Sequence, residues 1–298
     1  MNKKAALLSF VIIALACGGS YFYVMTPKGE MKVSYEPAAT ECYHEKSAVP
    51  WSYCINTAKQ GTNGSVAYLL HGRNKNENQW NDDSYYTAQL QKVWALAGIK
   101  PPKIVVISFG SFWLLTPKAT APKSGLLDIF IHEVIPEVEK HTGVPKTRLL
   151  FGESMGGLNT LIAILREGQL FKRALSLCPP IYRESPFSSF AVIQDFLKRT
   201  GADPRTIYGV KALGPQYAAN DEEWDNIAPL KLLEKADPSK IPPLYLSCGL
   251  YDRYGNYEAV ESFVEMARAR KFNLEWHPLY GGHCAVDIDS VSQFLARE

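Results

Sequence analysis

Residues 148–160 read RLLFGESMGGLNT, and the rest of the chain is arranged around this stretch. A short apolar run, Leu149–Phe151, meets the turn GESMG at 152–156, and the apolar residues that follow are spaced as on a helix. We therefore predict a strand, a tight turn and a helix. In a Gly-x-Ser-x-Gly turn the serine is strained, and larger side chains at the glycine positions would collide across the bend. Such a turn holds the Ser154 hydroxyl out at the carboxyl edge of a sheet.

Composition narrows the class of protein. The chain has 298 residues, 46% of them hydrophobic, which suffices for one large α/β domain or two small ones. A net charge of +2 without long basic runs argues against a nucleic-acid-binding surface. Six cysteines are too few for a disulfide scaffold, and the sequence has neither a Cys-x-x-Cys pair nor a His-Glu-x-x-His helix, so we predict no metal site.

An apolar segment near the amino terminus is expected to meet a membrane. Two lysines at positions 3 and 4 precede Ala5–Met25, which carries no charge and as a helix would match a hydrocarbon core of about 30 Å. We assign residues 1–27 to a cleaved signal peptide or an uncleaved membrane anchor; either exports the rest, because the lysines favour the inside. The sequence LACG at 15–18 also resembles a lipoprotein processing site, in which the cysteine is lipidated. A buried core helix is disfavoured by the terminal position. The expected location is the periplasm, the cell envelope or outside the cell, with a tether through residues 5–25 if that segment is retained.

Export would place the cysteines in an oxidising compartment. Cys42 and Cys54 lie in a polar, aromatic segment and are candidates for a disulfide that closes a small loop. Cys178 and Cys248 lie in apolar, strand-like runs, and we expect each to be a free buried thiol. Cys284 is expected to serve packing rather than act as a second nucleophile.

Short apolar strands alternate with helical patterns along the chain. The predicted strands, besides the one before Ser154, are Met31–Pro37, Trp51–Ile55, Ser65–Leu70, Lys103–Ser108, Ala174–Cys178, Leu244–Cys248 and Leu274–Leu279. Helical patterns fall near Thr87–Ala97, over 126–138 with a kink or break at Pro136, over 257–267 and over Ala285–Leu295. This alternation predicts an α/β fold with a mostly parallel sheet covered by helices on both faces. We expect one domain over residues 28–298, interrupted at about 181–240 by an inserted, cap-like segment.

Polar residues follow the ends of four predicted strands, where parallel sheets bind their ligands. These are the segment 71–73 (His-Gly-Arg), Ser154, Asp252 and His283. Serine, aspartate and histidine in this chain order are typical of an α/β-hydrolase catalytic triad. We predict Ser154 as nucleophile, His283 as general base and Asp252 as the carboxylate that orients the imidazole.

The oxyanion hole is expected to come from the backbone N–H groups of Met155 and Arg73.

Other histidines and acids are weaker candidates for the general base and its carboxylate partner, because their positions in the chain disfavour them. His71 precedes the nucleophile, His132 is on a helix and His277 is within a strand, so we interpret all three as structural. The remaining acids are Asp287 and Asp289, which follow the histidine too closely, and Asp225 and Asp237, which lie in the inserted segment.

Six motifs lie between residues 68 and 283: YLLHG (68–72) with Trp80, FIHEVIPEVEK (130–140), FGESMGGLNTLIA (151–163), LFKRALSLCP (170–179), CGLYD (248–252) and YGGH (280–283). Together they resemble the esterase D-type putative esterase family, which includes feruloyl and acetyl-xylan esterases, S-formylglutathione hydrolases and mycolyltransferases. The resemblance implies an α/β-hydrolase fold, the triad Ser154, Asp252 and His283, and no cofactor. The chain departs from the family in its polar loop after Gly72 and in the length of 181–240.

The expected function is that of a serine esterase that hydrolyses carboxylic esters through an acyl-enzyme intermediate. Its substrate would be a small-molecule or glycan-linked ester, and no nucleic-acid partner is expected. Contact with a membrane is expected only through the N-terminal segment, if that segment is not cleaved. An acyltransferase with the same triad is one alternative. A serine peptidase on the same fold is another, and it is disfavoured because the sequence shows no propeller or other domain that would select substrates by size. A non-catalytic binding module is disfavoured because all three triad positions are filled. The aromatic residues expected to flank the pocket, either stacking on a substrate or packing, are Trp80, Phe112, Trp113, Tyr251 and Tyr254.

Overall fold

The computed structural model describes residues 32–297, and the predicted signal peptide or anchor at 1–27 lies outside them. Within the described range, no helix combines the length and the apolar character that crossing a membrane requires. The strands are β1 (Ala39–Glu45), β2 (Trp51–Thr57), β3 (Val66–Leu70), β4 (Lys103–Ser108), β5 (Arg148–Glu153), β6 (Arg173–Leu177), β7 (Leu244–Gly249) and β8 (Leu274–Leu279). They form one sheet in the order β1-β2-β4-β3-β5-β6-β7-β8. The pairs β1–β2 and β2–β4 are antiparallel and the other five are parallel, which confirms the predicted α/β class.

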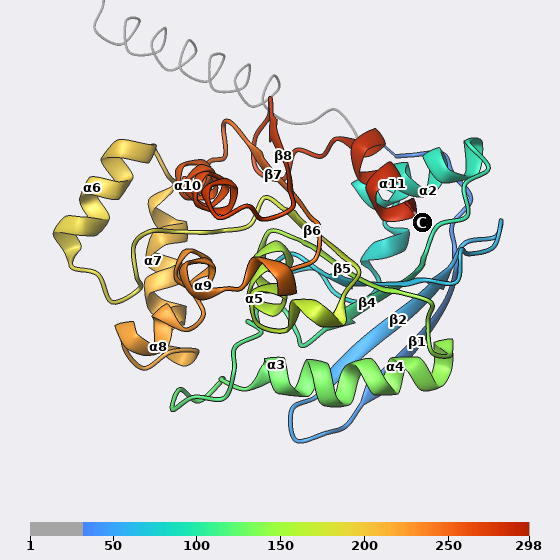
Figure 1. Cartoon of the computed structure of the whole chain (residues 1–298), viewed down its shortest axis with the longest axis horizontal. Helices are drawn as coiled ribbons and strands as arrows, with labels where there is room; N and C mark the ends of the chain where they lie inside the picture. Colours follow the sequence, from blue (N-terminus) through green and yellow to red (C-terminus); the bar gives the residue numbers. More distant parts are fainter. Residues whose placement is uncertain (1–31, 298) are drawn as a thin grey trace, which may run out of the picture.

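Helices cover both faces of this sheet (Figure 1). The α-helices are α2 (Tyr86–Leu96), α3 (Leu126–Ile129), α4 (Ile135–Thr142), α5 (Met155–Glu167), α6 (Phe190–Thr200), α7 (Pro204–Leu213), α8 (Asp221–Asp225), α9 (Pro229–Lys235), α10 (Asn256–Ala269) and α11 (Ile288–Ala296). Short helical turns are η1 (Gln79–Asn81), η2 (Phe130–Val134), η3 (Gly168–Leu170), η4 (Gly214–Gln216) and η5 (Pro238–Lys240). Helices α3, α4, α5, α9 and α10 bury their apolar residues in one core, while α2 and α11 bury theirs in a second.

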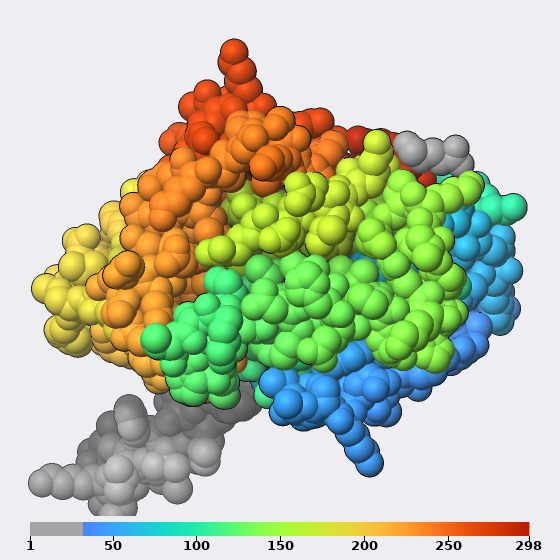
Figure 2. Space-filling view, turned by 60° about the horizontal axis from the view of Figure 1, so that its bottom comes forward, coloured from blue at the N-terminus to red at the C-terminus, as the bar shows by residue number. Residues whose placement is uncertain are grey.

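The two cores lie on opposite sides of the sheet because successive strand residues point to opposite faces. In β3, Tyr68 and Leu70 belong to the core under α5, whereas Ala67 and Leu69 belong to the core under α2. All five residues of β3 are buried, as expected of a central strand in a parallel sheet. Figure 2 shows the first of these faces, with the segment from α3 to α4 (green) across its middle and the β1–β2 hairpin (blue) beside it.

The helix expected over 126–138 continues past Pro136, with a widened turn just before the proline. It consists of α3, the π-helical turn η2 and α4, and the N–H of Ile135 donates to the carbonyl of Phe130, five residues earlier. Proline has no N–H to donate and its ring crowds the preceding turn, so a widened turn relieves the conflict without ending the helix.

The first predicted strand, Met31–Pro37, is wrong, because residues 32–38 form no strand and β1 begins at Ala39. Most of β1 is exposed at the edge of the sheet, so its residues show no apolar alternation that could have marked it. Cys42 of β1 lies directly opposite Cys54 of β2, and a disulfide joins them as proposed from the sequence.

The expectations for Cys178 and Cys284 are also wrong, since the two residues form a second disulfide. They are 106 residues apart in the chain and meet because the end of β6 and the loop after β8 reach the same edge of the sheet. Sequence spacing carries no signal for such a pair. Cys248, in contrast, is a buried free thiol as predicted.

The segment 181–240 leaves the sheet at the carboxyl end of β6 and returns at β7. It holds α6, α7, α8 and α9, and α6 and α7 pack on each other through a small core of their own that includes Ile193, Phe196 and Ile207. In Figure 1, α6, α7 and α8 gather at one side of the molecule, away from β1 and β2. Because ligands bind beyond the carboxyl ends of parallel strands, this segment overhangs the position where a site is expected.

Candidate active site

Ser154 sits at the junction of β5 and α5 in a strained backbone conformation, with φ 50° and ψ −119°. Glycine is required on both sides of this bend. A Cβ on Gly152 would lie 2.3 Å from the carbonyl oxygen of Gly156, and a Cβ on Gly156 would lie 1.7 Å from the carbonyl oxygen of Leu70. The steric explanation of the Gly-x-Ser-x-Gly motif therefore holds in this structure.

The structure brings Ser154, His283 and Asp252 together in one hydrogen-bonded chain. His283 Nε2 lies 2.9 Å from Ser154 Oγ, and His283 Nδ1 lies 2.7 Å from Asp252 Oδ2. An ionised carboxylate can only accept, so Nδ1 carries the hydrogen and Nε2 is left to accept from the serine hydroxyl. The side chain of Asp252 is fully buried and that of His283 is 16% exposed. The imidazole can therefore exchange protons with a bound molecule, while the carboxylate cannot contact solvent.

Further contacts fix Asp252 toward the imidazole. Its Oδ1 accepts from the N–H of Tyr254 at 2.9 Å, and its Oδ2 also accepts from the side-chain amide of Asn256 at 3.4 Å. Asn256 is fully buried at the start of α10, and sequence reasoning missed it. The ring of Tyr254 meets the His283 ring edge-on, with 4.4 Å between centroids.

Among the described residues, none of the competing histidines hydrogen-bonds to Ser154 or Asp252. His71 is buried, its Nδ1–H donates to the Gly72 carbonyl at 2.8 Å, and its Nε2 accepts from the Ser108 hydroxyl at 2.9 Å. Burial lowers the pKa of His71, which favours this neutral form. His277 stacks on Tyr245, and His132 is exposed on η2.

The competing acids are also used elsewhere or exposed. Asp287 accepts from the N–H of Ser290 at the start of α11, and Asp237 accepts from the N–H of Ser239. Asp289 is exposed at the first turn of α11, and Asp225 ends α8 in the inserted segment. Among the described residues, Asp252 is thus the carboxylate that meets His283.

A cleft of about 470 Å³ opens above this chain of hydrogen bonds. Ser154, Met155 and His283 line it together with Arg73 from the loop after β3. In the part of the chain that the structure describes, neither the N–H of Met155 nor that of Arg73 donates to a protein acceptor. Both residues predicted to supply the oxyanion hole border the cleft, and their N–H groups remain available to a bound oxyanion. The positive end of the α5 dipole also favours negative charge near Met155.

The buried carboxyl of Glu153 ties the loop after β3 to the Ser154 turn. It accepts from the N–H of Gly72 at 3.3 Å, from the amide of Gln79 at 3.0 Å and from the hydroxyl of Tyr85. Burial raises the pKa of Glu153, and the hydrogen bonds that it accepts oppose this rise. Glu153 was not among the residues predicted from the sequence. Its position, between an apolar strand and a tight turn, could have marked it as a buried carboxyl.

The Cys178–Cys284 disulfide lies beside the imidazole, because Cys284 follows His283 directly. The sulfurs of both cysteines and a His283 nitrogen lie within 4.8 Å of one another. Since both sulfurs are bonded to each other, they offer no thiolates to a metal ion.

Of the five aromatic residues expected around the pocket, Phe112 and Tyr254 line the cleft. Trp80 and Trp113 are buried instead, Trp80 in the core under α2 and Trp113 in the core under α5. Tyr251 is 64% exposed. Trp80 and Trp113 therefore serve packing.

Comparison with known proteins agrees with this architecture. The model of the family described as "Putative esterase" matches residues 47–287. A structure described as ferulic acid esterase superposes with a TM-score of 0.62 at 17% identity, covering 87% of this chain and 97% of that one. S-formylglutathione hydrolases from Agrobacterium tumefaciens and Staphylococcus aureus superpose with TM-scores of 0.58 and 0.53 at 13% and 20% identity. They cover 89% and 88% of this chain and 94% and 97% of their own. No curated protein matches the chain.

Proposed function

The chain belongs to the putative esterase family and is a carboxylic ester hydrolase, and we propose that it works as a serine esterase through an acyl-enzyme intermediate. The observation that carries the proposal is the hydrogen-bonded chain from Ser154 through His283 to Asp252. A serine hydroxyl is a poor nucleophile at neutral pH, and a positioned imidazole removes this obstacle by taking its proton as the new bond forms.

In the first half of the reaction, Ser154 Oγ attacks the carbonyl carbon of the ester while its proton moves to His283 Nε2. The carbonyl oxygen becomes negatively charged and binds the N–H groups of Met155 and Arg73. When the intermediate collapses, the bond to the alcohol oxygen breaks, and the imidazolium gives its proton to that oxygen. The acyl group stays on Ser154, the alcohol leaves, and Asp252 has stabilised the charged imidazole throughout.

In the second half, a water molecule takes the place of the alcohol. It gives a proton to His283 and attacks the acyl carbon, and the Ser154 oxygen then leaves with that proton. The products are a carboxylic acid and the free enzyme. If an alcohol enters instead of water, the same steps transfer the acyl group, so the acyltransferase reading differs only in the acceptor. Product analysis with glycerol or a sugar present in the reaction separates the two readings.

Labelling the purified protein with a fluorophosphonate tests the nucleophile directly, because these reagents phosphonylate activated serines. We expect one modification, mapped by mass spectrometry to the peptide that contains Ser154, and no modification in the Ser154→Ala variant. Ester hydrolysis by a protein whose label maps to another serine would contradict the assignment.

Export to an oxidising compartment is part of the proposal. It is supported by the apolar segment Ala5–Met25 after two lysines and by the two disulfides, which persist in such compartments and are rare in the cytosol. The substrate would then be a small-molecule or glycan-linked ester outside the cytoplasm. Cell fractionation with thiol alkylation tests this: we expect the protein in the envelope or medium, with Cys178 and Cys284 protected from alkylation. Protein found in the cytosol with alkylated cysteines would contradict export.

A further inference from the structure

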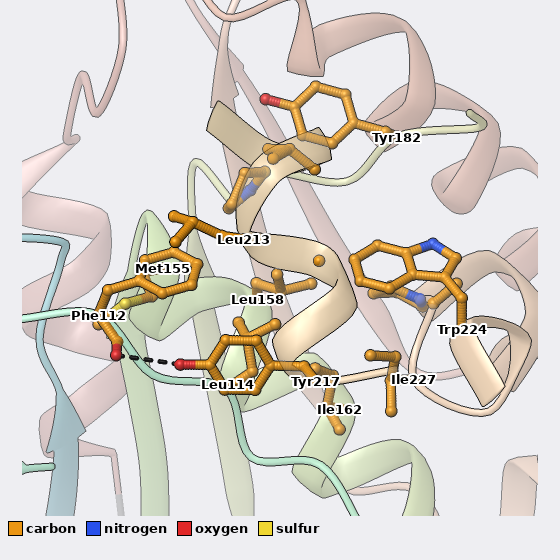
Figure 3. A pocket seen from close by; sticks show the side chains of 15 residues that line it. Phe112, Leu114, Met155, Leu158, Ile162, Tyr182, Leu213, Tyr217, Trp224 and Ile227 are labelled. Atoms are coloured by element: carbon orange, nitrogen blue, oxygen red, sulfur yellow. Dashed lines mark hydrogen bonds between the residues drawn. The ribbon is translucent and has the colours of Figure 1, made fainter. Parts of the chain in front are cut away.

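A second cavity, of about 70 Å³, continues from the cleft beneath the inserted segment (Figure 3). Phe112, Met155 and Leu213 line both spaces, so the cavity opens next to the residue that follows Ser154. Figure 3 shows Phe112 and Met155 on one side of the cavity and Trp224 and Ile227 on the opposite side.

The walls of the cavity are almost entirely apolar. Besides the aromatic residues they include Leu114, Leu158 and Ile162. The hydroxyl of Tyr217 is a polar atom at the wall, and it already donates to the carbonyl of Phe112 at 3.1 Å. Because most atoms of these walls offer no hydrogen bond, a charged or strongly polar group placed here would lose its hydrogen bonds to water without adequate replacement, whereas a hydrocarbon group would be stabilised.

We infer that this cavity binds the acyl group of the ester, and that this group is a short aliphatic chain. The inference rests on the proposed function, because the mechanism fixes which half of the substrate lies on which side. The alcohol oxygen must be near His283, which gives it a proton, and His283 lines the open cleft but not the cavity. The alcohol therefore leaves through the cleft, beside Arg73, Lys75 and Tyr254, and the acyl group extends into the cavity.

The volume limits the length of this chain. One water-sized probe needs roughly 10–15 Å³ measured in this way, so a cavity of about 70 Å³ accommodates a chain of only a few carbon atoms. Including the carbonyl carbon, which stays at Ser154, an acyl group of about four to six carbons fits. Burying each methylene should raise kcat/KM roughly fourfold until the cavity is full.

The cavity is closed by the segment 181–240, which supplies Leu213, Tyr217, Trp224 and Ile227. Its opposite wall is held in place by Asn159 of α5, a buried residue whose amide donates to the Trp113 carbonyl at 3.1 Å and accepts from the Leu115 N–H at 2.7 Å. Both walls are thus fixed by the fold, and the side chains of the inserted segment set the depth.

Kinetics on p-nitrophenyl esters test the assignment, because the leaving group stays constant while the acyl chain changes. For the wild-type chain we expect kcat/KM to rise at least tenfold from acetate to hexanoate and to fall again for decanoate. Leu213→Trp at the mouth and Ile227→Trp at the far wall should each lower the hexanoate-to-acetate ratio by tenfold or more. This ratio does not depend on how much of a variant is folded. Val192→Trp, at a residue of α6 that is 46% exposed and lines neither space, is the control and should leave the ratio unchanged.

A second series keeps the hexanoyl group and varies the alcohol among methyl, ethyl and p-nitrophenyl. Ile227→Trp, at a residue that lines the cavity and not the cleft, should not change the preference among these alcohols. A shift in alcohol preference with an unchanged acyl ratio would overturn the assignment and place the alcohol in the cavity. An unchanged acyl ratio in both tryptophan variants would overturn it as well. If the wild-type chain hydrolyses none of these esters, the proposed function fails and the acyl assignment fails with it.

Discussion

Cys284 follows His283 directly in the chain, and its sulfur is bonded to Cys178 at the end of β6. The loop that carries the imidazole is therefore attached covalently to the strand next to the Ser154 turn, since β6 pairs with β5. The proposed triad works only if its hydrogen bonds keep their geometry, because small displacements of a reacting group are costly. This disulfide is thus in a position to support catalysis as well as stability.

Replacing both cysteines tests that role. In the variant Cys178→Ser with Cys284→Ser, we expect kcat to fall about tenfold or more with a smaller change in KM, because the imidazole loses its covalent restraint. Unfolding should also become easier, by up to about 4–5 kcal/mol for a closed loop on the order of 100 residues. Steady-state kinetics and denaturant unfolding measure the two effects.

The other disulfide is the matched control. Cys42 and Cys54 are 12 residues apart and join β1 to β2 at the edge of the sheet, and neither lines the cleft. Replacing both with serine should cost up to about 3 kcal/mol of stability and leave kcat unchanged. Equal losses of kcat in the two double variants, or no loss in either, would show that the Cys178–Cys284 bond does not position His283.

Removal of the Ser154 hydroxyl tests the proposed nucleophile. Ser154→Ala should lower kcat/KM for p-nitrophenyl esters by at least roughly a thousandfold, because the proposed acyl-enzyme forms on the hydroxyl that this variant lacks. Ser111→Ala, in an exposed position after β4 and outside the cleft, is the control and should keep wild-type rates. A Ser154→Ala protein that retains most of its activity would rule out the proposed mechanism.

The buried carboxyl of Glu153 should make stability depend on pH. Its pKa is raised in the folded state by burial, so the folded chain binds this proton more tightly than the unfolded chain does. The stability that comes from this tighter binding is fully present below the unfolded pKa, about 4.3, and is lost as pH rises through the folded pKa. A neutral side chain of the same shape avoids this loss.

We therefore expect Glu153→Gln to raise Tm at pH 8 by about 2 °C or more. Glutamine can keep the contacts with Gly72, Gln79 and Tyr85, since Tyr85 can accept as well as donate. The gain should shrink toward zero below about pH 4. Glu265→Gln on the exposed side of α10 is the control and should leave Tm unchanged at both pH values. A Glu153→Gln variant that is less stable than wild type at pH 8 would mean that the charged carboxylate is stabilising.

The convergence of Ser154, Asp252 and His283 could be predicted because each follows a strand, and the carboxyl ends of parallel strands meet at one edge. What the sequence could not reveal depends on which side chains the folded sheet brings together. Glu153 meets Tyr85, and Cys178 meets Cys284, across distances in the chain that carry no periodic signal. The exposed edge strand β1 was misplaced for a different reason: a strand that buries little has no apolar pattern to read.

The close approach of α5 to β3 at Gly156 leads to a final prediction about stability. A Cβ on Gly156 would lie 1.7 Å from the carbonyl oxygen of Leu70, and that oxygen belongs to backbone at the end of a fully buried strand, so it cannot move aside. Gly156→Ala should therefore lower the free energy of unfolding by at least about 3 kcal/mol or prevent folding. Gly209 in α7 has open space around it, and Gly209→Ala should be neutral or stabilise by up to about 1 kcal/mol. Denaturant unfolding of both variants measures the difference, and a Gly156→Ala protein as stable as Gly209→Ala would mean that α5 can shift away from β3.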